Sequence, residues 1–557
     1  MNEKDHAKLE CGHAVWRRIF LSIAGIGALI AVGMAWLPLR VGLSHFVIED
    51  MHYYMTTARN AVQGQGVTLD GKHPTNGFHP LWMLICGLVH LAVGSRDVLA
   101  MHLVLTVCAG FLIATGYMIY RCMDRRAGPI LATAFVAWFL CNYRIMAAAL
   151  GGLETALNGF CISLMTVYLI LSGGIDTRRK SVVLGLLLGL AYWSRMDAFL
   201  LGGVVLLWVT FSAGWARIPA QFLRAFVAGA ISVITLIPWF VFSLVHSGTW
   251  LPNSARAINA WAAPTPDPES GALTVIQRLV KSRVDNLVDP ANDIGNLLGI
   301  WPFVPNPESP ILALGATALF VGVCFFVGLI WKVRRSPAMK DLWWIPVYAG
   351  VHIGFYISFG QPDIRCLYPA FIPLLIFGAA AVQVSCEQQA QRELCFRKAL
   401  LTLFIFILSG GIAGVFAFQK GFATCRYHSL HAGLYDLARC IERHSPPDAV
   451  IGSFNAGIIS YYSHRPTVNL DGVMNDSVIP AIVEKRLAEY LDREKIGYLA
   501  DMRGEIEKFM TGFGGDPDWT SKWQVVYEIK CPWGGGIGAV PMVIMQRQKQ
   551  DFMQNPF

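Results

Sequence analysis

Residues 19–50 read IFLSIAGIGALIAVGMAWLPLRVGLSHFVIED, an apolar run followed by two adjacent acids. A helix needs about 20 mostly apolar residues to cross a bilayer, and residues 19–39 meet this requirement. No small-residue cleavage site follows the run, so we expect a retained first span rather than a signal peptide. Glu49 and Asp50 then lie just beyond the end of that span, at the membrane surface.

The composition of the whole chain agrees with a membrane protein. Of its 557 residues, 54% are apolar and 15% are charged, whereas soluble chains typically have about 25% charged residues. This composition excludes a disordered protein, a fibrous protein and a single soluble domain. The 13 cysteines lie mostly in apolar runs and do not indicate a disulfide framework.

Eleven apolar runs are expected to be membrane spans, which predicts a polytopic α-helical protein. They are residues 19–39, 98–120, 128–148, 153–174, 181–196, 197–213, 222–247, 310–332, 342–359, 366–385 and 399–418. A twelfth run, 78–94, is shorter, and the charges of the connections decide whether it crosses. The positive-inside rule places short connections rich in Lys and Arg in the cytoplasm.

Six short connections hold 19 Lys and Arg in about 70 residues, whereas the other connections between spans hold 11 in about 140. The six are residues 1–18, 121–127, 173–182, 213–224, 332–341 and 386–398. All six lie in the cytoplasm only if residues 78–94 lie in the membrane interface instead of crossing. The sequence therefore predicts a cytoplasmic N-terminus and places residues 419–557 on the outer face.

Residues 419–557 are expected to form a soluble α/β domain that follows a membrane domain of residues 1–418. This region holds 15 Lys and Arg against 16 Asp and Glu, so the net charge of +8 indicates membrane topology rather than nucleic-acid binding. Alternating helices and strands favour a mainly parallel sheet. The expected helices are 428–444 and 478–494, and the expected strands are 449–454, 466–470, 496–500, 523–530 and 540–547. One disulfide, of undetermined pairing, is allowed among Cys425, Cys440 and Cys531.

Two long outer loops, 40–97 and 248–309, contain most of the polar residues of the membrane domain outside the basic connections, so we expect a site on the outer face. Asp50 is either the first acid of an interfacial helix or a general base. Cations from separate loops would together bind an anionic lipid head group, although each residue has a structural alternative as an anchor, cap or ion pair. The candidates for phosphate or substrate contact are Lys72, His79, Glu154, Arg195, Asp197, Arg256 and Arg365. In the soluble domain, Asn455 and Asp471 follow expected strands and are candidates on the acceptor side.

The order of several short motifs along the chain is informative. They are Glu49-Asp50, ARN (58–60), GQG (64–66), TNGFHPLW (75–82), GLET (152–155), SRMD (194–197), GTWLPNS (248–254), RCLYP (365–369) and NLDG (469–472). Together they resemble the GT-C superfamily of integral-membrane glycosyltransferases, from about residue 19 to residue 475. The subgroup that they resemble is the bacterial enzymes similar to mycobacterial arabinofuranosyltransferases.

This resemblance implies a hexosyl- or pentosyltransferase in the bacterial inner membrane. Its donor would be a polyprenyl-phosphate sugar, and its acceptor a glycan or lipid of the cell envelope. Asp50 takes the position of the catalytic base, and Glu49 replaces a family Asp as a helper or metal ligand. The resemblance requires no cofactor and leaves open a divalent cation at Asp50 and Glu49.

Two other classes of function are considered beside this one. A lipid-glycan flippase or transporter should contain inverted repeats and charges in the middle of its spans, whereas the acids here lie at span ends. A non-catalytic envelope scaffold would not need Asp50.

Overall fold

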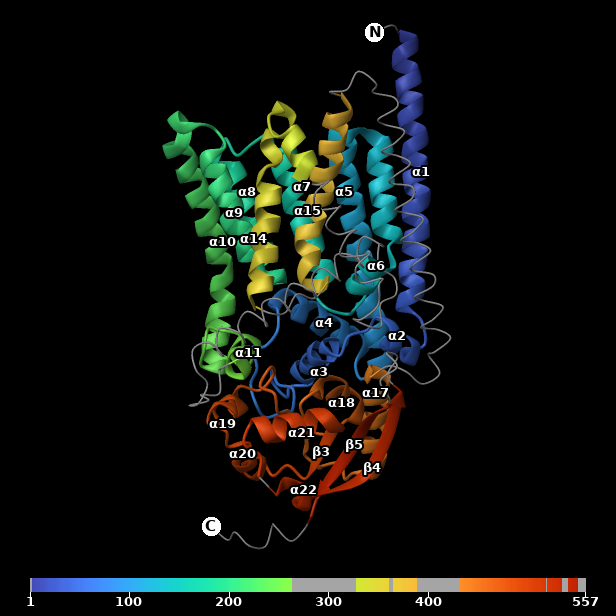
Figure 1. Ribbon diagram of the computed structural model, residues 1–557, viewed down its shortest axis with the longest axis vertical. Coiled ribbons are helices and arrows are strands. Elements are labelled where there is room, and N and C mark those ends of the chain that lie inside the picture. The colour runs from blue at the N-terminus through green and yellow to red at the C-terminus, as the bar shows by residue number, and fades with distance from the viewer. Residues whose placement is uncertain are drawn as a thin grey trace.

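The computed structural model describes residues 3–262, 327–359, 364–387, 430–516, 518–532 and 539–548. Within these ranges the chain forms a bundle of long helices and, at one end of it, a small sheet covered by further helices (Figure 1). The start of the chain lies at the end of the bundle that is remote from the sheet. The expected span 399–418, most of 310–332 and most of the loop 248–309 lie outside the described residues.

The bundle is built from apolar helices. They are α1 (Glu3–Ala35), α5 (Asp97–Cys141), α7 (Thr155–Leu171), α8 (Arg178–Ser194), α9 (Phe199–Phe211), α10 (Ile218–Ser247), α14 (Trp344–Phe359) and α15 (Ile364–Glu387). In the described part of the chain, four helices are long and apolar enough to cross a membrane by themselves, and shorter apolar helices accompany them. The chain is a multi-pass membrane protein, and eleven spans stay a prediction.

One break in the bundle separates two expected spans. α5 covers both 98–120 and most of 128–148, and Gly128 interrupts its helical geometry with φ 81° and ψ 164° just before Pro129. Glycine adopts positive φ without the steric cost that a Cβ imposes. The two halves of α5 pack on each other, since Leu140 lies 3.0 Å from where a Cβ of Gly116 would be. The short helix α6 (Tyr143–Ala149) follows.

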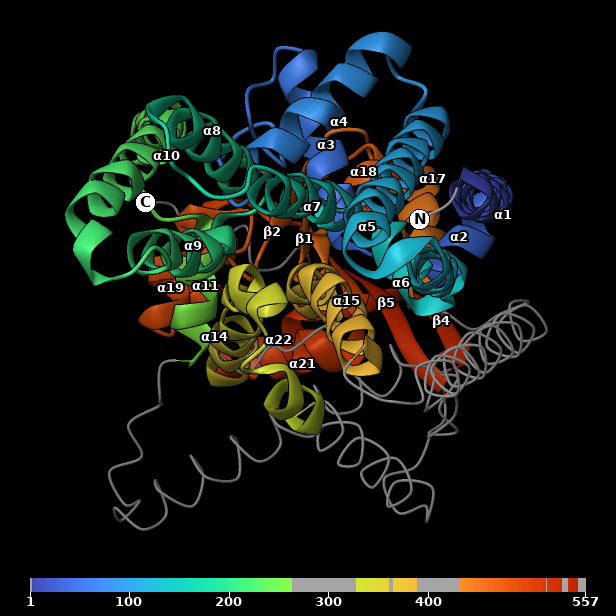
Figure 2. The ribbon, with the colours of Figure 1, turned by 90° about the horizontal axis from the view of Figure 1, so that it is seen from above.

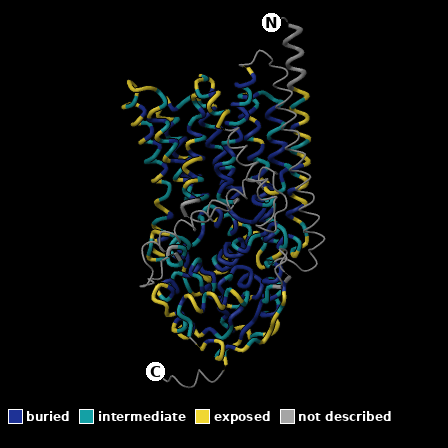
Figure 3. The backbone as a smooth tube through the Cα atoms, in the orientation of Figure 1, coloured by how far each residue is buried: buried dark blue, intermediate teal, exposed yellow. Residues whose placement is uncertain are grey.

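The first outer loop folds as short helices at the end of the bundle. α2 (Leu39–His45), α3 (Asp50–Val62) and α4 (Pro80–Val93) lie between the bundle and the sheet in Figure 1, and α11 (Asn253–Ala262) lies at the same level. α4 corresponds to the expected interfacial run 78–94. At the end of the bundle, this helix would lie along a membrane surface. Figure 3 shows mostly buried residues at this level, and residues 51–60 of α3 are all buried.

The C-terminal sheet has the strand order β2-β1-β3-β5-β4. The strands are β1 (Ile451–Ser453), β2 (Thr467–Asn469), β3 (Tyr498–Met502), β4 (Trp523–Pro532) and β5 (Ala539–Arg547). β2, β1 and β3 are parallel, whereas β5 is antiparallel to both β3 and β4. The expected mainly parallel sheet is therefore mixed. β4 and β5 follow each other along the chain without room for the crossover that parallel pairing requires.

Helices cover both faces of this sheet. α17 (Leu430–His444) and α18 (Ala456–Ser463) share the apolar core of the bundle. A second core lies on the other face, against α19 (Ile479–Val483), α20 (Leu487–Arg493), α21 (Arg503–Gly512) and α22 (Trp519–Lys522). Figure 2 shows the sheet and these helices under the end of the bundle.

Two details of this domain differ from the sequence expectations or extend them. The expected helix 478–494 is divided into α19 and α20, because Lys485 adopts a left-handed φ of 54° between them. Cys440 and Cys531 are buried free thiols, and Cys425 lies outside the described residues.

Candidate active site

The polar helix α3 brings the two candidate acids to the place where the bundle meets the C-terminal domain. Glu49 directly precedes the helix and Asp50 begins it. Successive residues of an α-helix are rotated by about 100°, so the two carboxylates point to different neighbours. Asp50 faces the bundle and Glu49 faces the C-terminal domain. Tyr54, four residues after Asp50, lies on the same face as Asp50.

Asp50 is paired with a cation from a distant part of the chain. Its Oδ2 accepts a hydrogen bond from Arg365 Nη1 at 3.0 Å. Arg365 is the second residue of α15, so its guanidinium lies at the end of the bundle next to α3. The Asp50 side chain is 48% exposed. The carboxylate is therefore oriented by the protein and still accessible to a substrate hydroxyl.

Glu154 is the centre of a second, more buried group. Its Oε2 accepts a hydrogen bond from Tyr54 Oη at 3.0 Å, and its Oε1 accepts one from Arg195 Nη1 at 3.1 Å. His79 Nε2 lies 3.6 Å from the same Oε1. The Tyr54 hydroxyl also accepts the backbone N–H of His79 at 3.1 Å. Residues from the first outer loop, α7 and the end of α8 thus meet here.

Arg195 is held by a second carboxylate as well. Its Nε donates to both Asp197 oxygens, at 3.1 and 3.0 Å. Its Nη2 donates to the hydroxyl of Tyr356 at 3.0 Å, and that hydroxyl donates to Asp197. Two carboxylates, those of Glu154 and Asp197, therefore share the positive charge of one guanidinium.

The two groups adjoin at the start of α15. Cys366 follows Arg365 in the chain, and its Sγ lies 3.6 Å from Arg195 Nη2. On the other side, Asp50 and Tyr54 come from one face of α3. The ends of α7, α8 and α15 and the first outer loop thus form one polar site, which we call the Asp50 site.

Electrostatics distinguishes the cations of the Asp50 site. Burial lowers the pKa of His79, whereas the carboxylate of Glu154 acts in the opposite direction. The charge of Arg195 is already balanced by carboxylates. Arg365, which lies beside the accessible Asp50, is thus better placed to meet an anionic ligand than Arg195.

Comparisons with known proteins find likenesses to parts of this chain and to its fold. A family model described as a domain of unknown function (DUF8728) matches residues 424–548. A search of the curated proteins found no match. Among solved structures, ArnT from Cupriavidus metallidurans bound to undecaprenyl phosphate has a TM-score of 0.55 at 14% identity, over 95% of this chain and 98% of ArnT. The archaeal oligosaccharyltransferase AglB from Archaeoglobus fulgidus, in complex with an inhibitory peptide and a dolichol-phosphate, has a TM-score of 0.52 at 13% identity, over 91% and 72%.

Both of these structures are glycosyltransferases of the GT-C type. The chain has the GT-C fold. The arabinofuranosyltransferase AftD from Mycobacteria is also similar, with a TM-score of 0.39 at 13% identity, over 96% of this chain and 40% of AftD. That likeness is too weak to assign a subgroup within the GT-C fold.

Within this fold, Glu49 is separated from the Asp50 site. Its side chain is buried, and its Oε1 accepts the backbone N–H of Gly457 at 2.9 Å. Burial, together with the charges of Asp50 and Asp501, raises the pKa of Glu49 well above its usual value.

The same geometry tests whether the acid pair fits a divalent cation, which binds convergent oxygen ligands. The carboxylates of Glu49 and Asp50 do not converge, because one faces Gly457 and the other faces Arg365. In the described part of the chain, no group of three or more His, Cys, Asp or Glu is placed to hold a metal ion. The pair does not fit a metal site, and no catalytic step is assigned to one.

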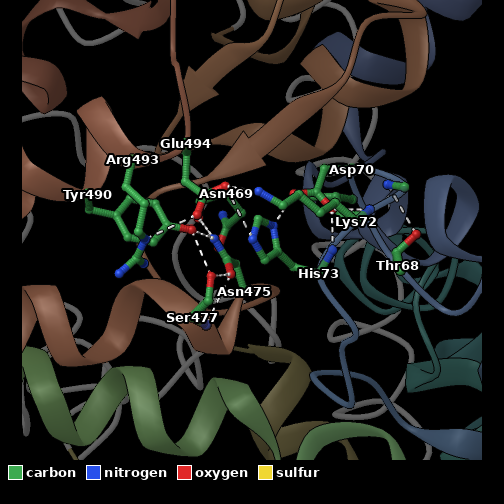
Figure 4. Close-up of polar contacts among 12 residues, drawn as sticks. Thr68, Asp70, Lys72, His73, Asn469, Asn475, Ser477, Tyr490, Arg493 and Glu494 are labelled. Atoms are coloured by element: carbon green, nitrogen blue, oxygen red, sulfur yellow. Dashed lines mark hydrogen bonds and ion pairs between the residues drawn. The ribbon is translucent and has the colours of Figure 1, made fainter. Parts of the chain in front are cut away.

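Lys72 lies away from the Asp50 site, at a contact between the first outer loop and the C-terminal domain (Figure 4). It forms an ion pair with Glu494. The neighbouring His73 lies between two carboxylates, with its Nδ1 2.6 Å from Asp70 and its Nε2 3.4 Å from Glu494. Lys72 therefore joins two parts of the protein.

Arg256 has a similar position in α11. Its guanidinium pairs with Asp476 of the C-terminal domain, and Trp261 of the same helix donates to the backbone oxygen of Asp471 at 2.8 Å. The second outer loop therefore contacts the C-terminal domain at this point, and the structure does not bring Arg256 to the Asp50 site.

The two candidates of the C-terminal domain differ in environment. Asn455 donates two hydrogen bonds to the Asp501 carboxylate, from its backbone N–H at 2.7 Å and from its side-chain Nδ2 at 2.9 Å. Asp471 is partly exposed, and burial raises its pKa to about 7. Its Oδ1 accepts the backbone N–H of Val473 at 2.9 Å. Asp471 thus remains an acceptor-side candidate, whereas Asn455 stabilises the turn in which it lies.

Sequence reasoning missed Tyr54, Tyr356 and Asp501. Tyr54 could have been found, because it lies one helical turn after Asp50 in the expected interfacial helix. Asp501 could also have been found, because it directly follows the expected strand 496–500, as Asn455 and Asp471 follow theirs. Tyr356 lies in an apolar segment, and its contacts depend on tertiary packing, so no local signal marked it.

Proposed function

We propose that this protein is a glycosyltransferase of the bacterial inner membrane. It transfers a sugar from a polyprenyl-phosphate donor to a glycan or lipid of the cell envelope, at the outer face of the membrane. The observation that carries the proposal is the Asp50–Arg365 pair at the polar end of a GT-C bundle. ArnT was solved with undecaprenyl phosphate and AglB with a dolichol-phosphate, which supports a lipid-phosphate donor.

The proposed reaction is a single displacement with inversion. The Asp50 carboxylate takes the proton of an acceptor hydroxyl while that oxygen attacks the anomeric carbon of the donor sugar. The bond between the anomeric carbon and the phosphate oxygen breaks, and polyprenyl phosphate leaves with the bonding electrons. One base suffices, because the leaving phosphate needs charge stabilisation rather than protonation.

The cations have different parts in this proposal. Arg365 contacts the leaving phosphate, since it lies beside Asp50 and its side chain is 24% exposed. Arg195 orients Glu154 and thereby Tyr54 and His79, because two carboxylates already balance its charge. His79 donates a hydrogen bond to phosphate or sugar from its imidazole.

Asp50→Asn tests the base. We expect the purified variant to lose at least about 100-fold in transfer rate from a polyprenyl-phosphate sugar, because the amide cannot accept the proton. The donor is first identified by mass spectrometry of the lipid that co-purifies. Asp176→Asn, in the exposed connection between α7 and α8, is the matched control and should keep the wild-type rate. Wild-type transfer by Asp50→Asn would refute the assignment.

A further inference from the structure

The turn after strand β1 presents four successive backbone N–H groups, those of residues 454–457. This turn lies at the carboxyl end of a parallel strand, between β1 and the helix α18. In doubly wound sheets, ligands bind at this end of the strands, beside the strand where the order reverses. Here the strand order β2-β1-β3 reverses at β1. The C-terminal domain therefore has the form of a ligand-binding α/β unit at this turn.

Protein side chains occupy all four of these donors. Asp501, at the end of β3, accepts the N–H groups of Phe454 and Asn455 at 2.9 and 2.7 Å. The other two acceptors come from the first outer loop. The Tyr53 hydroxyl accepts the N–H of Ala456 at 3.2 Å, and Glu49 Oε1 accepts the N–H of Gly457 at 2.9 Å.

The approach of the two parts is close enough to require glycine. A Cβ at position 457 would lie 2.7 Å from the backbone oxygen of Glu49. Real Cβ contacts with backbone atoms do not reach this distance, and neither backbone can move without shifting its helix. The contact thus leaves no room for a side chain between the start of α3 and α18 at this point.

Further contacts continue along the two helices. Thr56 Oγ1 lies 3.0 Å from Ser460 Oγ, and Arg59 Nη1 donates to the backbone oxygen of Tyr461 at 2.9 Å. Glu49, Tyr53, Thr56 and Arg59 are spaced as one face of an α-helix. Asp50 and Tyr54 are one residue further along in each turn and face the bundle. One face of α3 is thus bound to the C-terminal domain, and the adjacent face contributes to the Asp50 site.

We propose that the C-terminal domain uses the turn after β1 to hold α3, and that Glu49 is the positioning residue that orients Asp50 for transfer. This inference rests on the proposed function. It gives the domain of unknown function a task other than acceptor binding at this turn, since the N–H groups there bind Glu49 and Tyr53. The length of the Glu49 side chain brings its acceptor oxygen to the Gly457 N–H. Its negative charge is not required for this positioning role.

Two conservative variants of Glu49 distinguish the effect of its side-chain length from the effect of its charge. Glu49→Gln keeps the length of the side chain and an acceptor oxygen for the Gly457 N–H. Glu49→Asp keeps the charge but is one methylene shorter. We expect Glu49→Gln to retain at least half of the wild-type kcat, and Glu49→Asp and Gly457→Ala to lose about 10- to 100-fold in kcat with the donor KM within threefold. Glu489→Asp, on an exposed surface of the same domain, is the matched control.

The opposite ranking would overturn the proposal. If Glu49→Asp were active and Glu49→Gln were as inactive as Asp50→Asn, Glu49 would be a base or a cation ligand. If all three variants kept wild-type kcat, Glu49 would have no positioning role. Each variant must elute as a single species before its rates are compared.

Hydrogen–deuterium exchange gives a readout that does not depend on activity. We expect faster exchange of the amides of residues 456–460 in Glu49→Asp and Gly457→Ala, and wild-type exchange in Glu49→Gln. If Asp50→Asn were fully active, the proposed base would be wrong, and the exchange data would still decide whether Glu49 holds α18. If exchange were unchanged in all variants, the contact itself would be refuted.

Discussion

At the scale of single residues, a difference of one position separates two carboxylates that look equivalent in sequence. Glu49 is buried against Gly457, whereas Asp50 is half exposed beside Arg365. The acid pair and its place at the end of the helical bundle could be predicted, because both follow from the apolar run before it. The partner that each acid faces could not be predicted, because it depends on the orientation of α3 about its own axis between the bundle and the C-terminal domain.

The carboxyl of Asp471 gives a residue-scale prediction about pH. Burial raises its pKa to about 7, above the ordinary value of 3.8. Between these values the folded state binds a proton that the unfolded state has lost, so the free energy of unfolding falls as pH rises from about 4 to about 7. We expect Asp471→Asn to reduce this fall, by on the order of 1 kcal/mol because the side chain is partly exposed.

The measurement is the midpoint of thermal unfolding in detergent at about pH 5 and about pH 8. Glu49 has a raised pKa of the same direction and is present in both proteins, so Asp471→Asn should flatten the pH dependence without abolishing it. Asp448→Asn, at an exposed position, serves as the control and should follow the wild type. Identical profiles for Asp471→Asn and the wild type would contradict the burial argument.

At the scale of elements, hydrophobic runs located the described bundle helices well, because a span is determined by length and composition. For the run 78–94, the charges of the basic connections predict a place in the membrane interface, and the structure has α4 at the end of the bundle; the interface itself stays a prediction. Short elements were less predictable. The left-handed Lys485 divides one expected helix, and no sequence pattern marked that break. β5 makes the expected parallel sheet mixed, and the short connection from β4, which allows no parallel crossover, was a sequence signal for this that was not used.

The ion pairs that link the start of α7 to the end of α8 give an element-scale prediction about stability. Arg195 lies between the carboxylates of Glu154 and Asp197, and all three side chains are nearly buried. Removing the guanidinium in Arg195→Leu leaves two buried carboxylates without their cation, which costs about 3–5 kcal/mol. We therefore expect a clearly lower midpoint of thermal unfolding in detergent.

An ion pair with an exposed cation provides the comparison for this variant. Lys72 is 66% exposed and pairs with Glu494, whose side chain is only 6% exposed. Loss of Lys72 leaves the Glu494 carboxylate in contact with His73 at 3.4 Å and Arg493 at 3.3 Å, so we expect it to cost at most about 1 kcal/mol. Lys72→Ala should therefore unfold within a few degrees of the wild type. Equal destabilisation by Arg195→Leu and Lys72→Ala would show that the Arg195 group does not depend on buried charge pairing.

At the scale of the whole molecule, the basic connections in the described part of the chain gather at the end of the bundle that is remote from the sheet (Figure 1). Arg126, in the connection 121–127, pairs with Asp341 of the connection 332–341 and donates to the backbone oxygen of Ile170 at 3.4 Å. Lys332 donates to the backbone oxygen of Ser385 at 3.4 Å. The count of Lys and Arg thus correctly predicted that these distant connections lie at the same end of the bundle. It could do so because the bias toward positive charge acts on every connection independently of the fold.

The orientation of the molecule in its membrane is the prediction at this scale. The basic end should face the cytoplasm and the sheet should lie outside, so that the Asp50 site opens to the outer face. Asp176, in the connection before α8, and Glu489, in α20, have side chains that are 65% and 67% exposed. A membrane-impermeant maleimide should label Glu489→Cys in intact spheroplasts and Asp176→Cys only after permeabilisation. Unsubstituted protein measures the background labelling of the native cysteines. The reverse pattern would place the Asp50 site in the cytoplasm, where a donor presented at the outer leaflet could not reach Arg365.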